Sequence, residues 1–142
     1  MDDMYQGGAM WKEQVLGWRA RVGLILPSTN LLLETALPRM APEGVTFHAA
    51  RLTAGGTAGA DDLRKMARNI VAAAIDLASA KVDLIAYCCT ASSFIEGSSH
   101  DGAVSREILE ATGIRTITTM RAIVDALKEL EIRHLAMLSP YT

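Results

Sequence analysis

Short apolar stretches alternate along this chain with amphipathic stretches, and this alternation constrains the fold more than any other feature of the sequence. The first apolar stretch, residues 21–26, is nearly continuous and is stopped by Pro27. Continuous apolar character is typical of a strand that is buried on both faces of a parallel sheet. The same reasoning predicts further strands at residues 45–52, 82–87, 114–117 and 134–138.

The amphipathic stretches between these strands predict helices. One helix is expected over residues 31–40, after three residues that commonly cap helices: Ser28, Thr29 and Asn30. The clearest helix follows a flexible loop at residues 53–59, and two acidic residues at its start favour helix formation there. They are Asp61 and Asp62, and the buried stripe predicted after them consists of Leu63, Met66, Ile70, Ala74 and Leu77.

Two more helices are expected in the second half of the chain. The first runs through residues 104–109 and ends at Gly113, because glycine commonly terminates helices. Thr118 or Thr119 can cap the second, whose apolar stripe is Ile123, Val124, Leu127 and Leu130.

Strand and helix alternation at this spacing predicts an α/β fold, a parallel sheet flanked by helices on both faces. At 142 residues the chain is long enough for one domain with a core and too short for two ordinary ones. Residues 1–18 are expected to form an N-terminal tail outside the sheet, and residues 19–132 the α/β lobe. The strand at 134–138 is either a terminal edge strand or the point at which a larger fold is cut.

Composition excludes several classes of function. Half of the residues are hydrophobic, 21% are charged, and the net charge of −2 offers no basic excess to neutralise nucleic-acid phosphates. No apolar run approaches the roughly 20 residues that a membrane span needs. The first eleven residues lack the apolar core of a secretory signal, so a cytoplasmic location is expected. In a reducing compartment Cys88 and Cys89 are expected to be free thiols.

Three polar clusters follow predicted strands, and ligands of open parallel sheets gather at the carboxyl ends of strands. The clusters are residues 27–30, 88–93 and 139–142. In the second cluster, Cys89 can act as a nucleophile or base if main-chain N–H groups or a helix start favour its thiolate. Thr90 and the amides beyond it suit a carboxylate or enolate oxygen. Burial as a small apolar residue is an equal alternative for Cys89 and the favoured one for Cys88.

The other polar residues are ambiguous when they are considered singly. Asn30 can donate its amide to a carboxylate, although capping the next helix is favoured. Tyr141 can present its phenol to a ligand, although a role as a terminal aromatic is favoured. The three histidines lack metal-ligand spacing, and the glycines at positions 55, 56 and 59 match no nucleotide-binding loop. The histidines are therefore expected to have structural or solvent roles, and no nucleotide site is expected.

Taken together, the clusters resemble one enzyme family. Residues 17–30, with Glu34 after them, resemble the opening of maleate cis-trans isomerase-like proteins. Residues 80–93, which include Tyr-Cys-Cys-Thr-Ala-Ser-Ser, resemble the first catalytic-cysteine segment of that family. Residues 111–120 and 135–141 are similar to arylmalonate decarboxylase. The resemblance covers residues 17–142 and identifies the chain as similar to the N-terminal half of this branch of the Asp/Glu racemase superfamily.

The resemblance implies a fold of two similar lobes with the active site between them, one cysteine from each lobe, and no cofactor or metal. By position, Cys89 matches the catalytic cysteine of the first lobe, and Asn30 matches the asparagine that holds a substrate carboxylate. Thr90, the Ala91 amide and Tyr141 match the cradle that binds the substrate oxygen. Residues 133–142 would then be the first strand of a truncated second lobe.

The implied activity is a cofactor-independent isomerisation or racemisation of a small dicarboxylic acid such as maleate, through a cysteine thiolate. Decarboxylases of the family resemble this chain but carry glycine at the position of Cys89, which favours isomerase or racemase chemistry. A decarboxylase or hydrolase of the same family is an alternative. So is an inactive fragment or a carboxylate-binding module, because the second lobe is absent. The chain alone is expected to be weakly active or inactive, and to associate through exposed apolar surface, for instance as a homo-oligomer.

Overall fold

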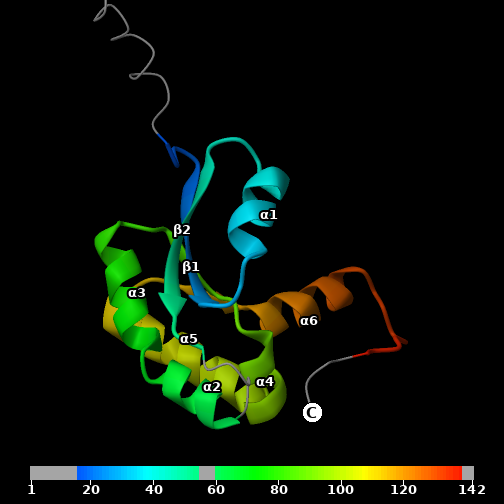
Figure 1. Cartoon of the computed structure of the whole chain (residues 1–142). Helices are drawn as coiled ribbons and strands as arrows, with labels where there is room; N and C mark the ends of the chain where they lie inside the picture. Colours follow the sequence, from blue (N-terminus) through cyan, green and yellow to red (C-terminus); the bar gives the residue numbers. More distant parts are fainter. Residues whose placement is uncertain (1–15, 55–59, 139–142) are drawn as a thin grey trace, which may run out of the picture.

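The computed structural model describes residues 16–54 and 60–138, which form a parallel sheet flanked by helices on both faces (Figure 1). The strands are β1 (Ala20–Pro27), β2 (Val45–Leu52), β3 (Leu84–Tyr87) and β4 (Thr116–Thr118), in the spatial order β2-β1-β3-β4. All three pairings are parallel. The predicted fold class and the first four predicted strands are therefore confirmed.

Side chains alternate between the two faces of the sheet, as the pleat requires. In β1 the Ile25 side chain joins the main hydrophobic core, whereas Leu24 lines a groove on the opposite face. The register aligns Ile25 with Tyr87 and Leu24 with Ala86, so β3 alternates in step with β1. Both Leu24 and Ile25 are buried, which explains why the strand is continuously apolar.

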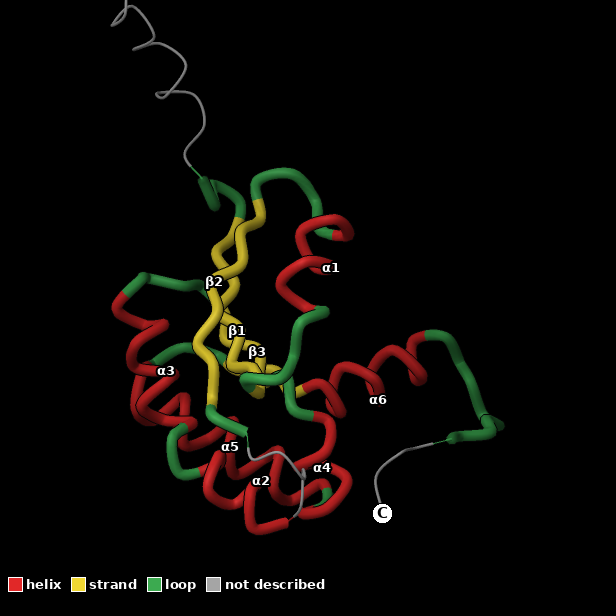
Figure 2. The backbone as a smooth tube through the Cα atoms, in the orientation of Figure 1, coloured by secondary structure: helices red, strands yellow, loops and turns green. Residues whose placement is uncertain are grey.

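Four helices cover one face of the sheet, which is called the covered face below: α2 (Ala60–Ala67), α3 (Ile70–Ser79), α4 (Thr90–Glu96) and α5 (Ser98–Thr112) (Figure 2). The left-handed Gly113 ends α5, and its N–H donates to the Leu109 carbonyl, as predicted for a C-terminal glycine. Buried residues from these helices and from the strands form one core cluster. Its members include Ile25, Met66, Ile70, Leu77, Ile85, Tyr87 and Ile108.

The long helix predicted after residue 60 is two helices. The N–H of Asn69 donates to the Met66 carbonyl at 3.1 Å, a tight three-residue step that breaks the helix between α2 and α3. The predicted apolar stripe is nevertheless buried in both helices, at Leu63, Met66, Ile70, Ala74 and Leu77.

The segment 88–100, predicted as a loop, contains α4 and the start of α5. Its serines and threonine lower helix propensity, but a serine hydroxyl can bond back to the main chain and does so here. The Ser92 hydroxyl donates to the Cys89 carbonyl at 2.9 Å. The prediction missed α4 because the tertiary contacts of so short a helix stabilise it more than its own residues do.

Two helices flank the other face, which is called the open face below: α1 (Leu33–Met40) and α6 (Thr119–Glu129). Neither helix contains a buried residue. Thr118, one of the two predicted caps, accepts from the Arg121 N–H at 3.2 Å. Between the helices lies a mainly apolar groove of about 450 Å³, lined chiefly by Val22, Leu24, Leu33, Leu37, Phe47, Leu84 and Ile117.

The strand predicted at residues 134–138 is wrong, because this described segment has no strand partner and leaves the sheet after α6. Met137 and Leu138 are 58% and 100% exposed. Most of the predicted tail, residues 1–15, lies outside the described residues. Trp18 contacts Gly44, where a Cβ would lie 2.3 Å from the indole ring, so glycine is required at that turn.

None of the helices within residues 16–54 and 60–138 has both the length and the apolar character that crossing a membrane requires. No group of three or more His, Cys, Asp or Glu side chains in these ranges is arranged to hold a metal ion.

Candidate active site

The loop between β1 and α1 is held to the end of β2. The Ser28 N–H donates to the Leu52 carbonyl at 2.7 Å, and the Ser28 hydroxyl accepts from the Ala54 N–H at 3.0 Å. The Arg51 side chain donates to the Ser28 carbonyl at 2.8 Å and also pairs with Glu34 of α1. These bonds fix the position of the first polar cluster at the carboxyl edge of the sheet.

Asn30 caps α1, as its residue type favours. Its side-chain oxygen accepts from the Leu32 and Leu33 N–H groups at 3.0 and 3.1 Å. This interaction fixes the orientation of the amide, whose NH₂ group is the end that donates hydrogen bonds. Capping and donation to a ligand therefore use different atoms of Asn30, and the two roles considered from the sequence are compatible.

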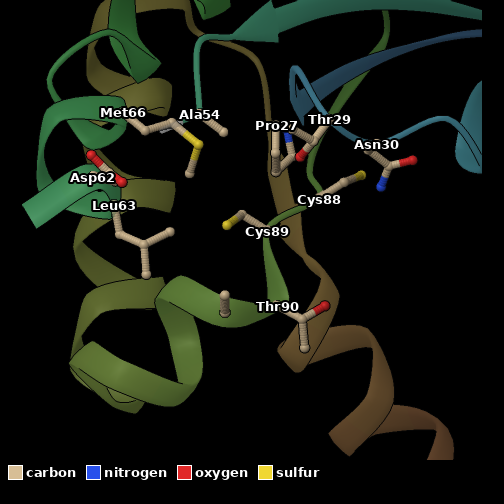
Figure 3. A pocket seen from close by; sticks show the side chains of 11 residues that line it. Pro27, Thr29, Asn30, Ala54, Asp62, Leu63, Met66, Cys88, Cys89 and Thr90 are labelled. Carbon is tan, nitrogen blue, oxygen red and sulfur yellow. The ribbon is translucent and has the colours of Figure 1, made fainter. Parts of the chain in front are cut away.

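Cys88 and Cys89 directly follow β3, and their side chains point to opposite sides (Figure 3). Cys89 precedes α4 and points toward Leu63 and Met66, and it is 4% exposed within the core cluster. Cys88 points to the side on which Asn30 lies and is only partly buried. Burial was the favoured prediction for Cys88, which is only partly buried, whereas Cys89, for which burial was one of two equal alternatives, is the buried thiol. The reason is that side chains alternate along this segment and the covered face is the better packed one.

A cavity of about 250 Å³ joins the first two polar clusters at the carboxyl ends of β1 and β3 (Figure 3). Four of the five predicted site residues line it: Asn30, Cys89, Thr90 and Ala91. The fifth, Tyr141, lies outside the described residues. The other described lining residues are Pro27, Thr29, Ala54, Asp62, Leu63, Met66 and Cys88.

The sequence did not single out Ala54, Asp62 or Met66 for this cavity. Asp62 was predicted only as an acidic residue that favours the start of a helix, and Met66 only as part of the buried stripe. Both project from α2, so their approach to Cys89 depends on how α2 packs beside α4. A sequence pattern gives the apolar face of α2 but not the element that this face meets.

The two thiols differ in their surroundings. Burial, and secondarily the neighbouring Cys89 charge, raises the pKa of the Cys88 thiol to about 11, against a smaller opposing effect of a hydrogen bond with Thr119. Cys88 is therefore a neutral thiol at physiological pH. Cys89 precedes α4, so the N–H groups that open this helix follow directly after it.

Residues 22–142 match the family model described as arylmalonate decarboxylase. The chain belongs to this family. Among the curated relatives, the maleate isomerase of Pseudomonas putida is 29% identical to this chain over 133 residues. The match covers 85% of this chain and 53% of that protein. The maleate isomerase of Geobacillus stearothermophilus is 26% identical over 134 residues, with the same two shares. The chain spans about half the length of the curated relatives it matches.

Solved structures of the arylmalonate decarboxylase family and of maleate isomerases have the same fold. A maleate isomerase variant from Pseudomonas putida, solved with maleate, is 27% identical with a TM-score of 0.70, and the match covers 79% of this chain and 49% of that one. Unliganded arylmalonate decarboxylase is 25% identical with a TM-score of 0.67, over 80% and 48%. The racemase-like lobe predicted from the resemblance is thus confirmed.

Proposed function

We propose that this chain provides the first-lobe half of a cofactor-independent isomerase site for a small dicarboxylic acid such as maleate, with the Cys89 thiolate as nucleophile. The observation that carries the proposal is that one cavity brings together Cys89, the Asn30 amide and the start of α4 at Thr90 and Ala91. These groups come from two separate strand ends. A thiol combined with neutral hydrogen-bond donors is the chemistry that addition to an unsaturated carboxylate requires.

The proposed reaction is balanced without a cofactor. The Cys89 sulfur donates an electron pair to one alkene carbon, a C–S bond forms, and the π electrons move toward the carboxylate on the other carbon. The former double bond is now single and rotates. The electrons then return to re-form the double bond in the trans geometry, the C–S bond breaks, and the thiolate is restored.

Each polar group has an assigned role in this proposal. The Asn30 NH₂ donates to a substrate carboxylate, while its oxygen stays bound to the first turn of α1. The Thr90 hydroxyl and the Ala91 N–H donate to the oxygen on which negative charge develops. Tyr141 is proposed to complete this cradle.

The relatives support a maleate-type substrate. Four curated relatives of this chain are maleate isomerases, and one related structure contains maleate. The cysteine at position 89 supports isomerisation over decarboxylation, because the decarboxylases that the chain resembles carry glycine there. Racemisation is the second candidate, and it requires a second thiol on the opposite face of the substrate.

Competitive alkylation tests the proposed thiolate. The full chain is treated with iodoacetamide at mildly acidic pH, with and without maleate, and each cysteine is quantified by mass spectrometry. Cys89 is expected to react at least tenfold faster than Cys88, and maleate is expected to slow Cys89 selectively. Cys88→Ser and Cys89→Ser are the matched variants, since each leaves one thiol. Equally slow alkylation of both thiols would refute the proposal.

A second measurement distinguishes the proposed isomerase function from that of a carboxylate-binding module. Proton NMR follows the conversion of maleate to fumarate by the parent chain and by the Cys89→Ser variant at high protein concentration. Turnover that disappears in Cys89→Ser supports the isomerase. Maleate protection of Cys89 without turnover indicates a half-site that binds the carboxylate and needs further protein for catalysis.

A further inference from the structure

Close to Cys89 lie two buried hydroxyl groups that the proposed reaction does not use. They belong to Tyr87 and Ser92, which are 1% and 2% exposed. Their oxygens are 3.1 Å apart. Polar groups buried so deeply in an apolar core cost stability unless hydrogen bonds compensate, so their position beside the candidate nucleophile needs an explanation.

The backbone holds both hydroxyls next to Cys89. Tyr87 and Cys89 are two residues apart at the end of β3, so their side chains project from the same face of the sheet. Ser92 lies in the first turn of α4, and its hydroxyl donates to the Cys89 carbonyl at 2.9 Å. The Tyr87 hydroxyl lies within hydrogen-bonding reach of the Cys89 side chain, and both residues belong to the same core cluster.

The hydrogen atoms can be assigned from these contacts. Since the Ser92 hydrogen is directed to the Cys89 carbonyl, the Tyr87 hydrogen can point either to the Ser92 oxygen or to the Cys89 sulfur. A neutral thiol is a weak acceptor, so Tyr87 then donates to Ser92. A thiolate is a strong, charged acceptor, and rotation about the Tyr87 C–O bond redirects the hydrogen to it.

We propose that Tyr87 is a positioning residue for Cys89, and that its hydroxyl hydrogen switches from Ser92 to the Cys89 sulfur when the thiolate forms. The inference rests on the proposed function, since it concerns the same thiolate. No proton is transferred and no heavy atom moves in this switch. The arrangement would stabilise the Cys89 thiolate through a hydrogen bond donated from the core.

The ionisation state of Tyr87 supports this role. Burial, then the charge of the Cys89 thiolate and the hydrogen bond to it, and more weakly Asp101, raise the pKa of the phenol far above its usual range, against an opposing effect of Ser92. The Tyr87 phenol therefore stays protonated over the pH range in which a cysteine thiolate reacts as a nucleophile. It can act as a donor and cannot act as a base.

The test is the pH–rate profile of Cys89 alkylation by iodoacetamide, measured in the full chain with Cys88→Ser so that one thiol reacts. Adding Tyr87→Phe removes the donor and retains the ring. The midpoint of the profile is expected to rise by about one pH unit, which slows alkylation about tenfold below the midpoint. An unchanged profile in a folded Tyr87→Phe variant overturns the inference.

Two further variants separate positioning from a purely structural role. Ser93→Ala is the matched control, because this buried hydroxyl on the same helix donates to Asp101 at 2.6 Å instead, and the profile is expected to stay in place. Ser92→Ala removes the acceptor that competes with sulfur, so the midpoint is expected to fall. General loosening of the core would move the Ser92 and Tyr87 variants in the same direction and would overturn the inference.

The Ser92→Ala variant also covers the case in which Tyr87→Phe fails to fold. In that case a lower midpoint supports the switch, and an unchanged or higher one overturns it.

The outcomes of these experiments also distinguish failure of this inference from failure of the proposed function. If Cys89 is no more reactive than Cys88 in the parent chain, the proposed function fails. If Cys89 is selectively reactive and protected by maleate, yet insensitive to Tyr87 and Ser92, only the present inference fails.

Discussion

The covered and open faces of one sheet have different kinds of packing. On the covered face, Ile25 and Ile85 are fully buried beneath α3 and α5, which supply six residues of the core cluster. On the open face, α1 and α6 bury none of their own residues and leave an apolar groove of about 450 Å³ between them. The strands present apolar side chains toward both sides, so the difference in packing comes from the helices.

The candidate site lies where these faces meet. Cys89 extends the covered face and Cys88 extends the open face, and both line the same cavity. Packing in the core cluster can hold the Cys89 sulfur in place. On the open face, α1 and α6 are less tightly packed against the site. This contrast suggests that the covered face stabilises the fold and the nucleophile, and that the open face provides access and contacts.

The largest expected effect on the free energy of unfolding distinguishes two neighbouring residues of β3. Ile85→Ala removes a fully buried side chain and is expected to lower the free energy of unfolding by about 3 kcal/mol. Leu84→Ala, one residue earlier on the open face, is expected to cost about 1 kcal/mol because Leu84 is half-buried. Urea denaturation measures both. Equal losses would contradict the distinction between the faces.

The next largest effect on stability concerns Asp101, which links α4 on the covered face to the start of α6 on the open face. Asp101 of α5 accepts from Ser93 at 2.6 Å and from Thr118, the cap of α6, at 2.8 Å. Asp101→Ala leaves both buried hydroxyls without this acceptor and is expected to cost about 2 kcal/mol in urea denaturation. The control is Asp61→Ala, which breaks an exposed ion pair with Arg64 and should cost less than about 0.5 kcal/mol.

A smaller effect is a dependence of stability on alkaline pH. Burial raises the pKa of Cys88 to about 11 in the folded state, above the 9.0 of an unperturbed thiol. The folded state therefore binds this proton more tightly, and stability falls as pH rises from about 9 toward 11. Cys88→Ala is expected to remove about 1 kcal/mol of the loss between pH 8 and pH 10. Identical pH dependence in both proteins would contradict this prediction.

The smallest effect on stability tests the open face as a contact surface, through which we propose that copies of the chain associate. Ile123 of α6 is 39% exposed, so Ile123→Lys is expected to change the free energy of unfolding by less than about 0.5 kcal/mol. Sedimentation velocity should nevertheless show weaker self-association. Ile75→Lys, at a residue 51% exposed on α3, is the matched control and should leave association unchanged.

Local patterns predicted most of the elements. The apolar run before Pro27 became β1, the N-terminal and C-terminal signals at Asn30, Thr118 and Gly113 function as predicted, and every member of the stripe through α2 and α3 is buried. These features depend on neighbours in sequence. Polar residues at strand ends also led to Asn30, Cys89, Thr90 and Ala91, which line one cavity.

The sequence determined which side chains each strand and helix presents, because pleat, helical period and capping act over a few residues. Only the tertiary structure decided how those faces are used. It broke one predicted helix at Asn69, formed α4 where a loop was expected, left residues 134–138 without a strand partner, and buried Cys89 more deeply than Cys88. Each of these outcomes depends on contacts between segments far apart in the chain, whose energies local patterns do not contain.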